Sequence, residues 1–247
     1  MKRIQEVRRE LTNQFFKRLR TAYYRFAFGR SVPFKGAVAD LVHDWERRTG
    51  KGDVPKTREA WEAQYRTNEW AYMDRLDEFA RYAVIIGYIA YLKPQAAVLD
   101  VGCGEGVLFE RYRPYGYAKY VGLDISEAAV ATLGSKQDAK TVFLQADAEA
   151  YETTELYDVI VFNESQYYFH DPISTLERYS RALKPGGFFV LSTYAASQRA
   201  MAILARLKTL YGTVDETVTK QGAKAWYCTV LKGHPEGSPA GSKDEPF

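Results

Sequence analysis

Through the middle of the chain, short apolar runs rich in β-branched residues alternate with segments of helical periodicity. The runs predict strands at residues 97–101, 120–124, 141–144, 158–162, 188–192, 216–220 and 225–231. Helices are expected over residues 126–133, 172–183 and 197–210. Such alternation is typical of an α/β fold with a mostly parallel sheet and helices on both faces. Because the last two strands follow a helix as a pair, we expect a seven-stranded sheet with an antiparallel edge.

The two ends of the chain differ from this middle part. Residues 1–60 are basic and aromatic with helical spacing, so we expect a helical N-terminal extension that serves as a lid. Residues 61–232 carry the alternating pattern and form the predicted catalytic domain. Residues 233–247 contain three prolines and few apolar side chains, which predicts a flexible C-terminal tail.

Charge separates the extension from the rest of the chain. The formal net charge is +3, but residues 1–30 contain nine basic and two acidic residues and carry +7, which leaves −4 on the remainder. A basic helix with interleaved aromatic residues is typical of contact with an anionic membrane surface. The same helix would also suit packing across the mouth of a site, or binding of RNA phosphates. The acidic remainder gives no support to a nucleic-acid partner at the active site.

Cysteine content and hydropathy indicate the compartment. Cys103 and Cys228 are the two cysteines, which rules out a disulfide framework and suits a reducing cytoplasm. No apolar run approaches the roughly 20 residues that a membrane span needs. The basic N-terminus lacks the apolar core of a secretory signal. We therefore expect a cytoplasmic protein, with peripheral membrane contact through residues 1–30 left open.

A glycine-rich loop follows the first predicted strand, at residues 100–106. Its spacing fails the dinucleotide fingerprint, because Val107 stands where the third small residue belongs, and it fails the phosphate-loop pattern as well. Asp100, just before the glycines, would repel a pyrophosphate. A cationic ligand with a ribose fits better: Asp124 ends the second strand, where a carboxylate can accept from ribose hydroxyls, and Asp147 could accept from an adenine amino group.

Five segments, at residues 98–106, 120–126, 146–148, 157–162 and 183–187, resemble in order and spacing the class I S-adenosylmethionine-dependent methyltransferases. The resemblance is strong over residues 95–194 and implies a Rossmann-like fold with S-adenosylmethionine as cofactor and S-adenosylhomocysteine as product. It implies a cofactor site that includes Asp100, with the glycine loop at the methionine part, Asp124 at the ribose, and the segment after the third strand at the adenine. The remaining members that it implies are Gly102, Cys103 and Gly104 at the methionine, Ile125, Asp147 and Ala148 at the adenine, and Asn163 near the sulfonium.

Aromatic residues before the first strand resemble a W-x-x-x-Y pattern with a following aromatic pair, found in many small-molecule methyltransferases of this class. Trp61 and Tyr65 form the first part, and Trp70 and Tyr72 the second. The resemblance implies that Tyr65 and Tyr72 cover the cofactor. Arg81 is a candidate partner for the methionine carboxylate.

The catalytic candidates follow the fourth strand, at residues 163–172. This stretch lacks the N/D-P-P-Y/F tetrad of enzymes that methylate nucleic-acid bases or glutamine, and it resembles the S/C-E-x-x-Y-Y stretch of bacterial enzymes acting on sugars and small metabolites, including nodulation-factor N-methyltransferases. His170 or Glu164 would act as general base, and Tyr168 is a third candidate. No cluster has metal-ligand spacing, so no metal is expected.

These observations predict methyl transfer to oxygen or nitrogen of a small molecule such as a sugar, a glycolipid or a secondary metabolite. Two alternatives stay open, and both use the N-terminal extension, residues 1–60, which we call the arm. The first is an RNA methyltransferase in which the basic residues 1–30 of the arm bind phosphates. The second is a non-catalytic cofactor-binding protein that docks to a membrane or a partner through these basic residues. The sequence does not indicate the acceptor or the oligomeric state.

Overall fold

The computed structural model of the protein describes residues 2–27, 37–38, 41–42, 44–46 and 56–233. The N-terminal part contains α1 (Lys2–Ala22), the π-helical turn η1 (Tyr23–Ala27), α3 (Arg58–Arg66), η2 (Ala71–Asp74) and α4 (Leu76–Leu92). The strands are β1 (Ala97–Val101), β2 (Lys119–Asp124), β3 (Thr141–Gln145), β4 (Tyr157–Asn163), β5 (Leu183–Tyr194), β6 (Thr213–Gln221) and β7 (Lys224–Lys232). Between them lie α5 (Val107–Tyr112), η3 (Arg113–Tyr115), α6 (Glu127–Ala131), η4 (Gly134–Lys136), η5 (Gln166–Tyr168), α7 (Pro172–Ser180) and α8 (Gln198–Tyr211). The predicted tail lies, apart from residue 233, outside these residues.

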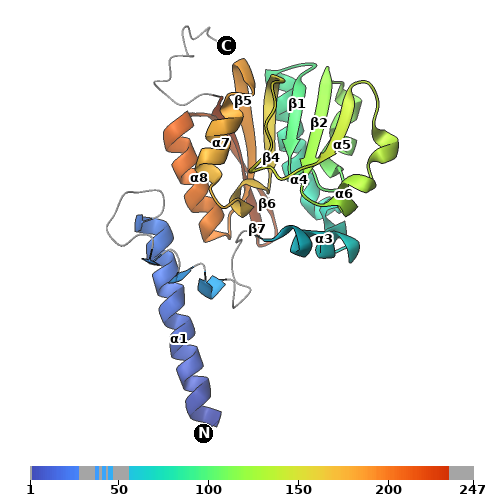
Figure 1. The fold of residues 1–247 in the computed structure, drawn as a ribbon. Coiled ribbons are helices and arrows are strands. Elements are labelled where there is room, and N and C mark those ends of the chain that lie inside the picture. Colours follow the sequence, from blue (N-terminus) through green and yellow to red (C-terminus); the bar gives the residue numbers. More distant parts are fainter. Residues whose placement is uncertain (1, 28–36, 39–40, 43, 47–55, 234–247) are drawn as a thin grey trace.

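The sheet has seven strands in the order β3-β2-β1-β4-β5-β7-β6 (Figure 1). The strands β1 to β5 pair in parallel, whereas β7 pairs antiparallel with both β5 and β6. The predicted α/β class and antiparallel edge are therefore confirmed. The strand order reverses between β1 and β4, and in open α/β sheets ligands bind outside the carboxyl ends of the strands at such a point.

Alternate residues of the central strands serve two apolar layers. On β1, Leu99 belongs to the cluster formed with α7 and α8, and Val98 belongs to the cluster formed with α4 and α5. Because the side chains of a strand alternate between faces, a strand buried on both sides is apolar throughout, as the five residues of β1 are apart from Asp100. Helices thus cover both faces, as predicted.

Side-chain caps explain where three helices begin. Ser126 and Ser197 accept from the backbone N–H groups three residues later, at 3.2 and 3.1 Å, and begin α6 and α8. Asp171 caps α7 in the same way, and Pro172 takes the first helical position, where no N–H is needed.

Several predicted boundaries were wrong by a few residues. β5 begins at Leu183 rather than at 188, because Leu183 already pairs with Tyr157 of β4. The register between the two strands shifts before Phe188, and Gly186, with a φ of 69°, permits the irregular backbone there. α7 ends at Ser180 and α6 at Ala131, both earlier than expected. β6 begins at Thr213, where an edge strand needs no apolar run to pair with β7.

The N-terminal helix is present as predicted. Figure 1 shows α1 extending away from the domain, with η1 at its inner end. Tyr23 and Tyr24 are buried there in a small cluster to which Ala202 of α8 contributes, and Thr21 and Gln198 exchange hydrogen bonds. Within the described part of the chain, no helix is long and apolar enough to cross a membrane.

Candidate active site

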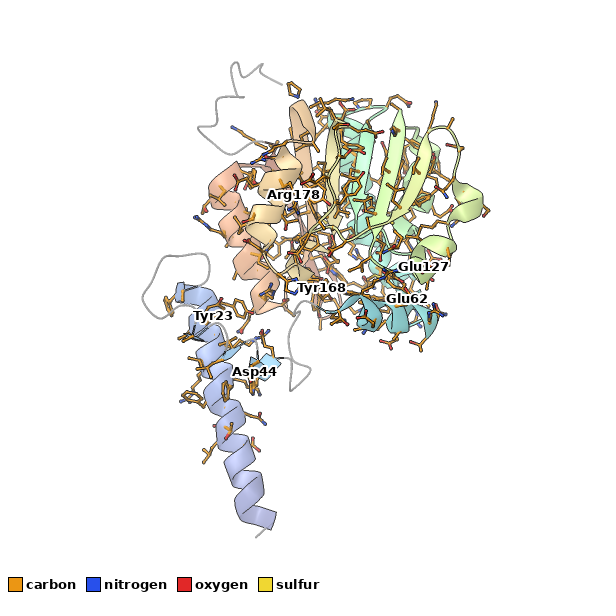
Figure 2. The ribbon with its side chains drawn as sticks, viewed as in Figure 1. Tyr23, Asp44, Glu62, Glu127, Tyr168 and Arg178 are labelled. Carbon is orange, nitrogen blue, oxygen red and sulfur yellow. The ribbon has the colours of Figure 1, made fainter. Side chains whose placement is uncertain are left out.

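A cavity of about 970 Å³ opens at the carboxyl ends of β1, β2 and β4. This volume is at the upper end of the range, about 300–1,000 Å³, of small-molecule sites. Lys56, α3, η2 and the start of α4 cover it, and none of the described arm residues before Lys56 lines it. Figure 2 shows Tyr168 and Glu62 at this end of the sheet. The cover predicted for residues 1–60 therefore comes from residues 56–81, and the alternative of an arm packed across the mouth is not seen among the described residues.

The glycine loop is closed by backbone contacts with the end of β2. The N–H groups of Gly102 and Cys103 both donate to Leu123 O at 2.8 Å, and Gly104 N donates to Asp124 Oδ2 at 2.9 Å. Gly102 and Gly104 have φ values of 81° and 53°. A Cβ would lie 2.6 Å from Ser165 Cβ at Gly102 and 2.8 Å from Tyr65 Oη at Gly104. Both positions therefore require glycine, because a side chain there would be strained and would collide with Ser165 or Tyr65.

Asp124 lies in the cavity as a buried carboxyl. Its Oδ1 accepts from Ser126 N at 2.9 Å, so each of its oxygens already holds one backbone N–H. Burial raises the pKa of Asp124 to about 6, although the N–H groups of Ser126 and Gly104 lower it. Each carboxylate oxygen has a further lone pair that can accept from a ligand hydroxyl.

Three predicted cofactor residues do not line the cavity. Asp100 is buried behind the loop, where Tyr120 donates to its Oδ2 at 2.7 Å, and burial raises its pKa to about 7. Cys103 turns its side chain into the apolar cluster beside Gly122, where its Sγ would lie 2.9 Å from an added Cβ. Gly104 is absent from the lining because Tyr65 lies over it. These three residues therefore lie outside the lining, and their predicted contacts with the cofactor stay predictions.

The opposite wall matches the predicted adenine side. Ile125, Asp147 and Ala148 all line the cavity. Asp147 is exposed at its edge, and its Oδ1 accepts from Glu149 N at 2.9 Å. Tyr179 donates to Ala148 O at 3.0 Å and fixes this loop from below.

Aromatic rings form the cover. The ring of Trp70 lies 5.7 Å from that of Trp61, 6.3 Å from that of Tyr65 and 5.9 Å from that of Tyr72, and the ring of Trp61 contacts Tyr168 edge-on at 4.8 Å. Burial raises the pKa of Tyr65, and the nearby Asp124 carboxylate raises it further. Tyr65 and Tyr72 both line the cavity, so the structure places them where the sequence predicted a cover.

Glu62 holds this cover onto the domain. Ser126 Oγ donates to Glu62 Oε2 at 2.7 Å, and Ala128 N donates to both oxygens at 3.2 Å. The carboxylate thus binds the first turn of α6, where backbone N–H groups have no helical partner. Sequence reasoning missed this role, although Glu62 lies inside the W-x-x-x-Y segment.

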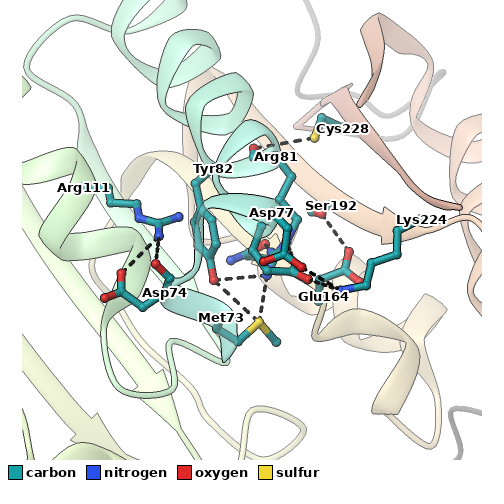
Figure 3. Close-up of polar contacts among 12 residues, drawn as sticks. Met73, Asp74, Asp77, Arg81, Tyr82, Arg111, Glu164, Ser192, Lys224 and Cys228 are labelled. Carbon is teal, nitrogen blue, oxygen red and sulfur yellow. Dashed lines mark hydrogen bonds and ion pairs between the residues drawn. The ribbon is translucent and has the colours of Figure 1, made fainter. Parts of the chain in front are cut away.

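Arg81 is buried in a polar network between α4, β4 and β7 (Figure 3). Its Nε donates to Glu78 Oε2 at 3.0 Å, and its Nη1 donates to Asn163 Oδ1 at the end of β4. Lys224 of β7 contacts Glu78 Oε1 at 2.8 Å and Asp77 Oδ2 at 3.4 Å. Arg81 and Asn163 both line the cavity, but their facing groups are already bonded to each other.

Glu164 is held in the cavity directly after β4. Its backbone is in the left-handed region, with a φ of 63°, which costs a non-glycine residue about 1–3 kcal/mol and is characteristic of functional sites. Ser192 Oγ donates to Glu164 Oε1 at 2.7 Å, and Tyr167 Oη donates to Oε2 at 2.8 Å (Figure 3 shows the Ser192 contact). The carboxylate is therefore fixed in one orientation.

His170 lies at the rim. Its side chain is 79% exposed, and its Nδ1 lies 2.8 Å from Glu149 Oε2. Burial raises the pKa of Glu149, but the N–H groups of His170 and Asp171 and the His170 ring lower it on balance. Tyr168 and His170 both line the cavity. Tyr194, Lys224 and Trp226, which the motifs did not reveal, complete the wall on the antiparallel side.

The residues fit the cofactor that the resemblance implies. The lining offers a carboxylate with free lone pairs at Asp124, the backbone of Gly102, and acidic groups suited to a sulfonium. Among the described residues, no group of three or more His, Cys, Asp or Glu side chains is placed to hold a metal ion.

Similarity to curated proteins covers part of the chain. A ubiquinone biosynthesis O-methyltransferase of Leptothrix cholodnii is 37% identical over 102 residues, which are 39% of this chain and 43% of that protein. The corresponding protein of Aliivibrio fischeri is 39% identical over 101 residues, with the same coverage. The matched region spans less than half the length of these relatives.

Two solved structures share the fold. The N-methyltransferase NodS from Bradyrhizobium japonicum, in complex with S-adenosylhomocysteine, matches with a TM-score of 0.58 and 19% identity over 66% of this chain and 91% of that one. The 1,6-didemethyltoxoflavin-N1-methyltransferase of Burkholderia thailandensis matches with a TM-score of 0.58 and 17% identity over 82% and 91%.

The family model "Methyltransferase domain" matches residues 63–236, which is more than half of the chain. This match covers every strand of the sheet and the whole wall of the cavity from Tyr65 onward. The chain therefore belongs to the methyltransferase domain family.

Proposed function

We propose that the protein transfers a methyl group from S-adenosylmethionine to an oxygen or nitrogen atom of a small molecule. The observation that carries the proposal is the placement of Asp124 and Glu164 in one cavity, on opposite sides of the end of β1. One carboxyl is suited to holding the cofactor and the other to the acceptor. Family membership supports the same assignment.

On the cofactor side, Asp124 would accept from the ribose hydroxyls, and Ile125, Asp147 and Ala148 would enclose the adenine. Gly102 would lie under the methionine part, with Tyr65 and Tyr72 above. Arg81 and Asn163 would stand at the methionine and sulfonium end. When bound, S-adenosylmethionine supplies a methyl group activated by its sulfonium.

On the acceptor side, Glu164 is the proposed general base. Its carboxylate would take the proton from an acceptor hydroxyl as the oxygen bonds to the methyl carbon and the bond from that carbon to sulfur breaks, which leaves S-adenosylhomocysteine. An acceptor ammonium would have to lose its proton to the carboxylate first, so that the nitrogen lone pair is free to attack. Ser192 and Tyr167 hold the carboxylate in place. Of the other two candidates, Tyr168 would form a wall against the acceptor, and the exposed His170 would act at the rim.

A ring-bearing hydroxylated acceptor suits the acceptor side best. Tyr72, Tyr194 and Trp226 line it with aromatic surface, and rings pack favourably on such surface. The curated relatives are named as ubiquinone biosynthesis O-methyltransferases, which supports a hydroxylated ring as the first class to test. The RNA alternative lacks comparable support, because the chain outside residues 1–30 carries −4.

The test is a methyl-transfer assay with S-adenosylmethionine against hydroxylated quinone precursors and phenols, amino sugars and a transfer-RNA pool, read by mass spectrometry. We expect a methylated product from a small molecule, formed most rapidly with a hydroxylated ring. The variant Glu164→Gln, which lacks the proposed base, should form the same product far more slowly and so shows that the product comes from this site. Methylation of RNA alone, or no binding of S-adenosylhomocysteine, would contradict the proposal.

We also propose that the arm contacts an anionic membrane surface. Leu11 and Phe15 lie one turn apart on α1, and both are about 60% exposed, as is Phe26. Lys17 and Arg18 are exposed beside them, and residues 1–30 carry +7. Exposed apolar side chains among basic ones suit the interface of an anionic bilayer. Tyr23 and Tyr24 do not contribute, because they are buried against the domain.

Liposome sedimentation tests this contact. We expect the full chain to pellet with vesicles containing phosphatidylserine and to remain in the supernatant with neutral phosphatidylcholine vesicles. The double variant Leu11→Ser/Phe15→Ser should weaken pelleting without changing S-adenosylhomocysteine affinity. Equal behaviour with both vesicle types would overturn the membrane proposal and leave methyl transfer intact.

A further inference from the structure

A buried arginine lies between the arm and the active-site loop. Arg199, in the first turn of α8, is only 2% exposed. Its Nε donates to Tyr167 O at 2.9 Å, and its Nη2 donates to Phe169 O at 2.7 Å. Both carbonyls belong to the segment 164–171, which carries the catalytic candidates Glu164, Tyr168 and His170. The planar guanidinium therefore holds two points of this loop at once.

The arm packs on the helix that carries Arg199, because Tyr24 lies in an apolar cluster to which Ala202 of α8 contributes. Tyr24 is buried and donates to Glu46 Oε2 at 3.1 Å, and Arg20 Nε contacts Glu46 Oε1 at 2.5 Å. Burial and the Glu46 carboxylate raise the pKa of Tyr24, whereas Arg199 beside its hydroxyl lowers it. Arg199 also lowers the pKa of Glu46, which burial raises. The arm thus contributes a buried carboxylate and a phenol to the surroundings of Arg199.

A charge buried in this way is stable only with opposite charge and hydrogen-bond acceptors around it. The loop supplies the carbonyls of Tyr167 and Phe169, and the arm supplies the nearby carboxylate. Tyr167 in turn donates its hydroxyl to Glu164 at 2.8 Å. The packing of Tyr24 on α8 and the hydrogen bonds of Arg199 therefore place Glu46 and the carboxylate in the cavity at the two ends of one group of neighbouring residues.

We propose that Arg199 is a positioning residue that couples the N-terminal arm to the segment 164–171, so that seating of the arm on α8 sets the geometry of the acceptor side. Catalytic consequences of this coupling rest on the proposed function, but the coupling itself is a property of the fold. It assigns the arm a role inside the enzyme in addition to any surface that it contacts.

Hydrogen–deuterium exchange of the full chain tests the coupling without an acceptor. Tyr24→Phe and Glu46→Gln are changed in the arm alone, and each is expected to raise exchange in the peptide 164–171 by at least about threefold. Peptides from β1 and α5 should exchange as in the wild type. Arg199→Lys keeps the charge but not the fork, so it should raise exchange of the loop while leaving the peptide 19–27 protected. Gln14→Ala, at an exposed position of α1 outside the proposed contacts, is the matched control and should change neither region.

Two results would overturn the proposal: an unchanged loop when peptide 19–27 has lost its protection, or a uniform rise throughout the domain. With an acceptor found by the assay above, Tyr24→Phe should raise the acceptor KM by at least about threefold and leave S-adenosylhomocysteine affinity within about twofold. An unchanged KM would limit Arg199 to a structural role and contradict the coupling to the acceptor side. Failure of S-adenosylhomocysteine to bind the wild type would sink the proposed function instead, and the exchange result would stand separately.

Discussion

The two halves of the cavity are built in different ways. On the cofactor side, the contacts of Asp124 come from Gly104 and Ser126, all within the β1–β2 region. On the acceptor side, Glu164 depends on Ser192 of β5 and on Tyr167 of η5. The first half is a local backbone motif, whereas the second is assembled from distant elements and from the loop that Arg199 holds. Substitutions should therefore separate binding of the cofactor from turnover of the acceptor.

The largest expected effect is on the acceptor side. Glu164→Gln keeps the size of the side chain but removes the proposed base, and general bases contribute about 10²–10⁴-fold to rate. We expect kcat to fall by at least about 100-fold. Steady-state kinetics measure kcat with the acceptor that the methyl-transfer assay identifies. Glu177→Gln, at an exposed position of α7, is the surface control. Full activity would leave a mechanism of positioning alone.

On the cofactor side, Asp124→Ala should weaken S-adenosylhomocysteine binding by about 100-fold, because a buried acceptor of ligand hydroxyls is lost. The fold should persist, since α6 keeps its Ser126 cap and its contact with Glu62. Differential scanning fluorimetry should show ligand-induced stabilisation of the wild type and little in the variant. Equal stabilisation of both would remove Asp124 from the cofactor site.

A pH dependence sharpens the assignment to Asp124. Burial raises its pKa to about 6, so its protonated fraction grows as the pH falls through that value. Because the ionised carboxylate is the better acceptor for ligand hydroxyls, affinity should decrease below this pKa, by at most about tenfold per pH unit. Calorimetry on both sides of the pKa should show this decline. In Asp124→Asn, the affinity for S-adenosylhomocysteine should no longer depend on pH in this range. If the affinity of this variant still declines at low pH, the titrating group is Asp100, whose pKa is raised to about 7.

The smallest effect is expected at the rim. His170→Ala removes an exposed ring that contacts Glu149, while the backbone N–H groups of His170 and Asp171 still bind that carboxylate. We expect turnover to change by no more than about threefold, as for an exposed side chain in contact with solvent. A loss as large as that of Glu164→Gln would make His170 the base and would exchange the roles of these two side chains.

Local patterns predicted the cofactor half well. The strands β1 to β4 and the placement of Asp124 followed from short apolar runs and from a carboxylate at a strand end. The direction of the Cys103 side chain could not be predicted from these patterns, because it depends on the space that Gly122 leaves on the neighbouring strand β2. Register across a sheet is a property of two segments, and neither reveals it alone.

The acceptor half was less accessible to sequence reasoning. Ser192 and Glu164 are 28 positions apart, so only the strand order brings them together. Lys224 and Trp226 lie on an antiparallel strand beyond the recognisable motifs. The arm was expected to be a lid because its composition suits a surface helix, but Tyr23 and Tyr24 fix it against α8.

The most direct test is a calorimetric titration of S-adenosylhomocysteine into the wild type, Asp124→Ala and Glu164→Gln side by side. We expect binding to the wild type, binding within about twofold of it in Glu164→Gln, and a loss of about 100-fold in Asp124→Ala. Equal loss in both variants, or no loss in Asp124→Ala, would contradict the division of the cavity into a cofactor side and an acceptor side.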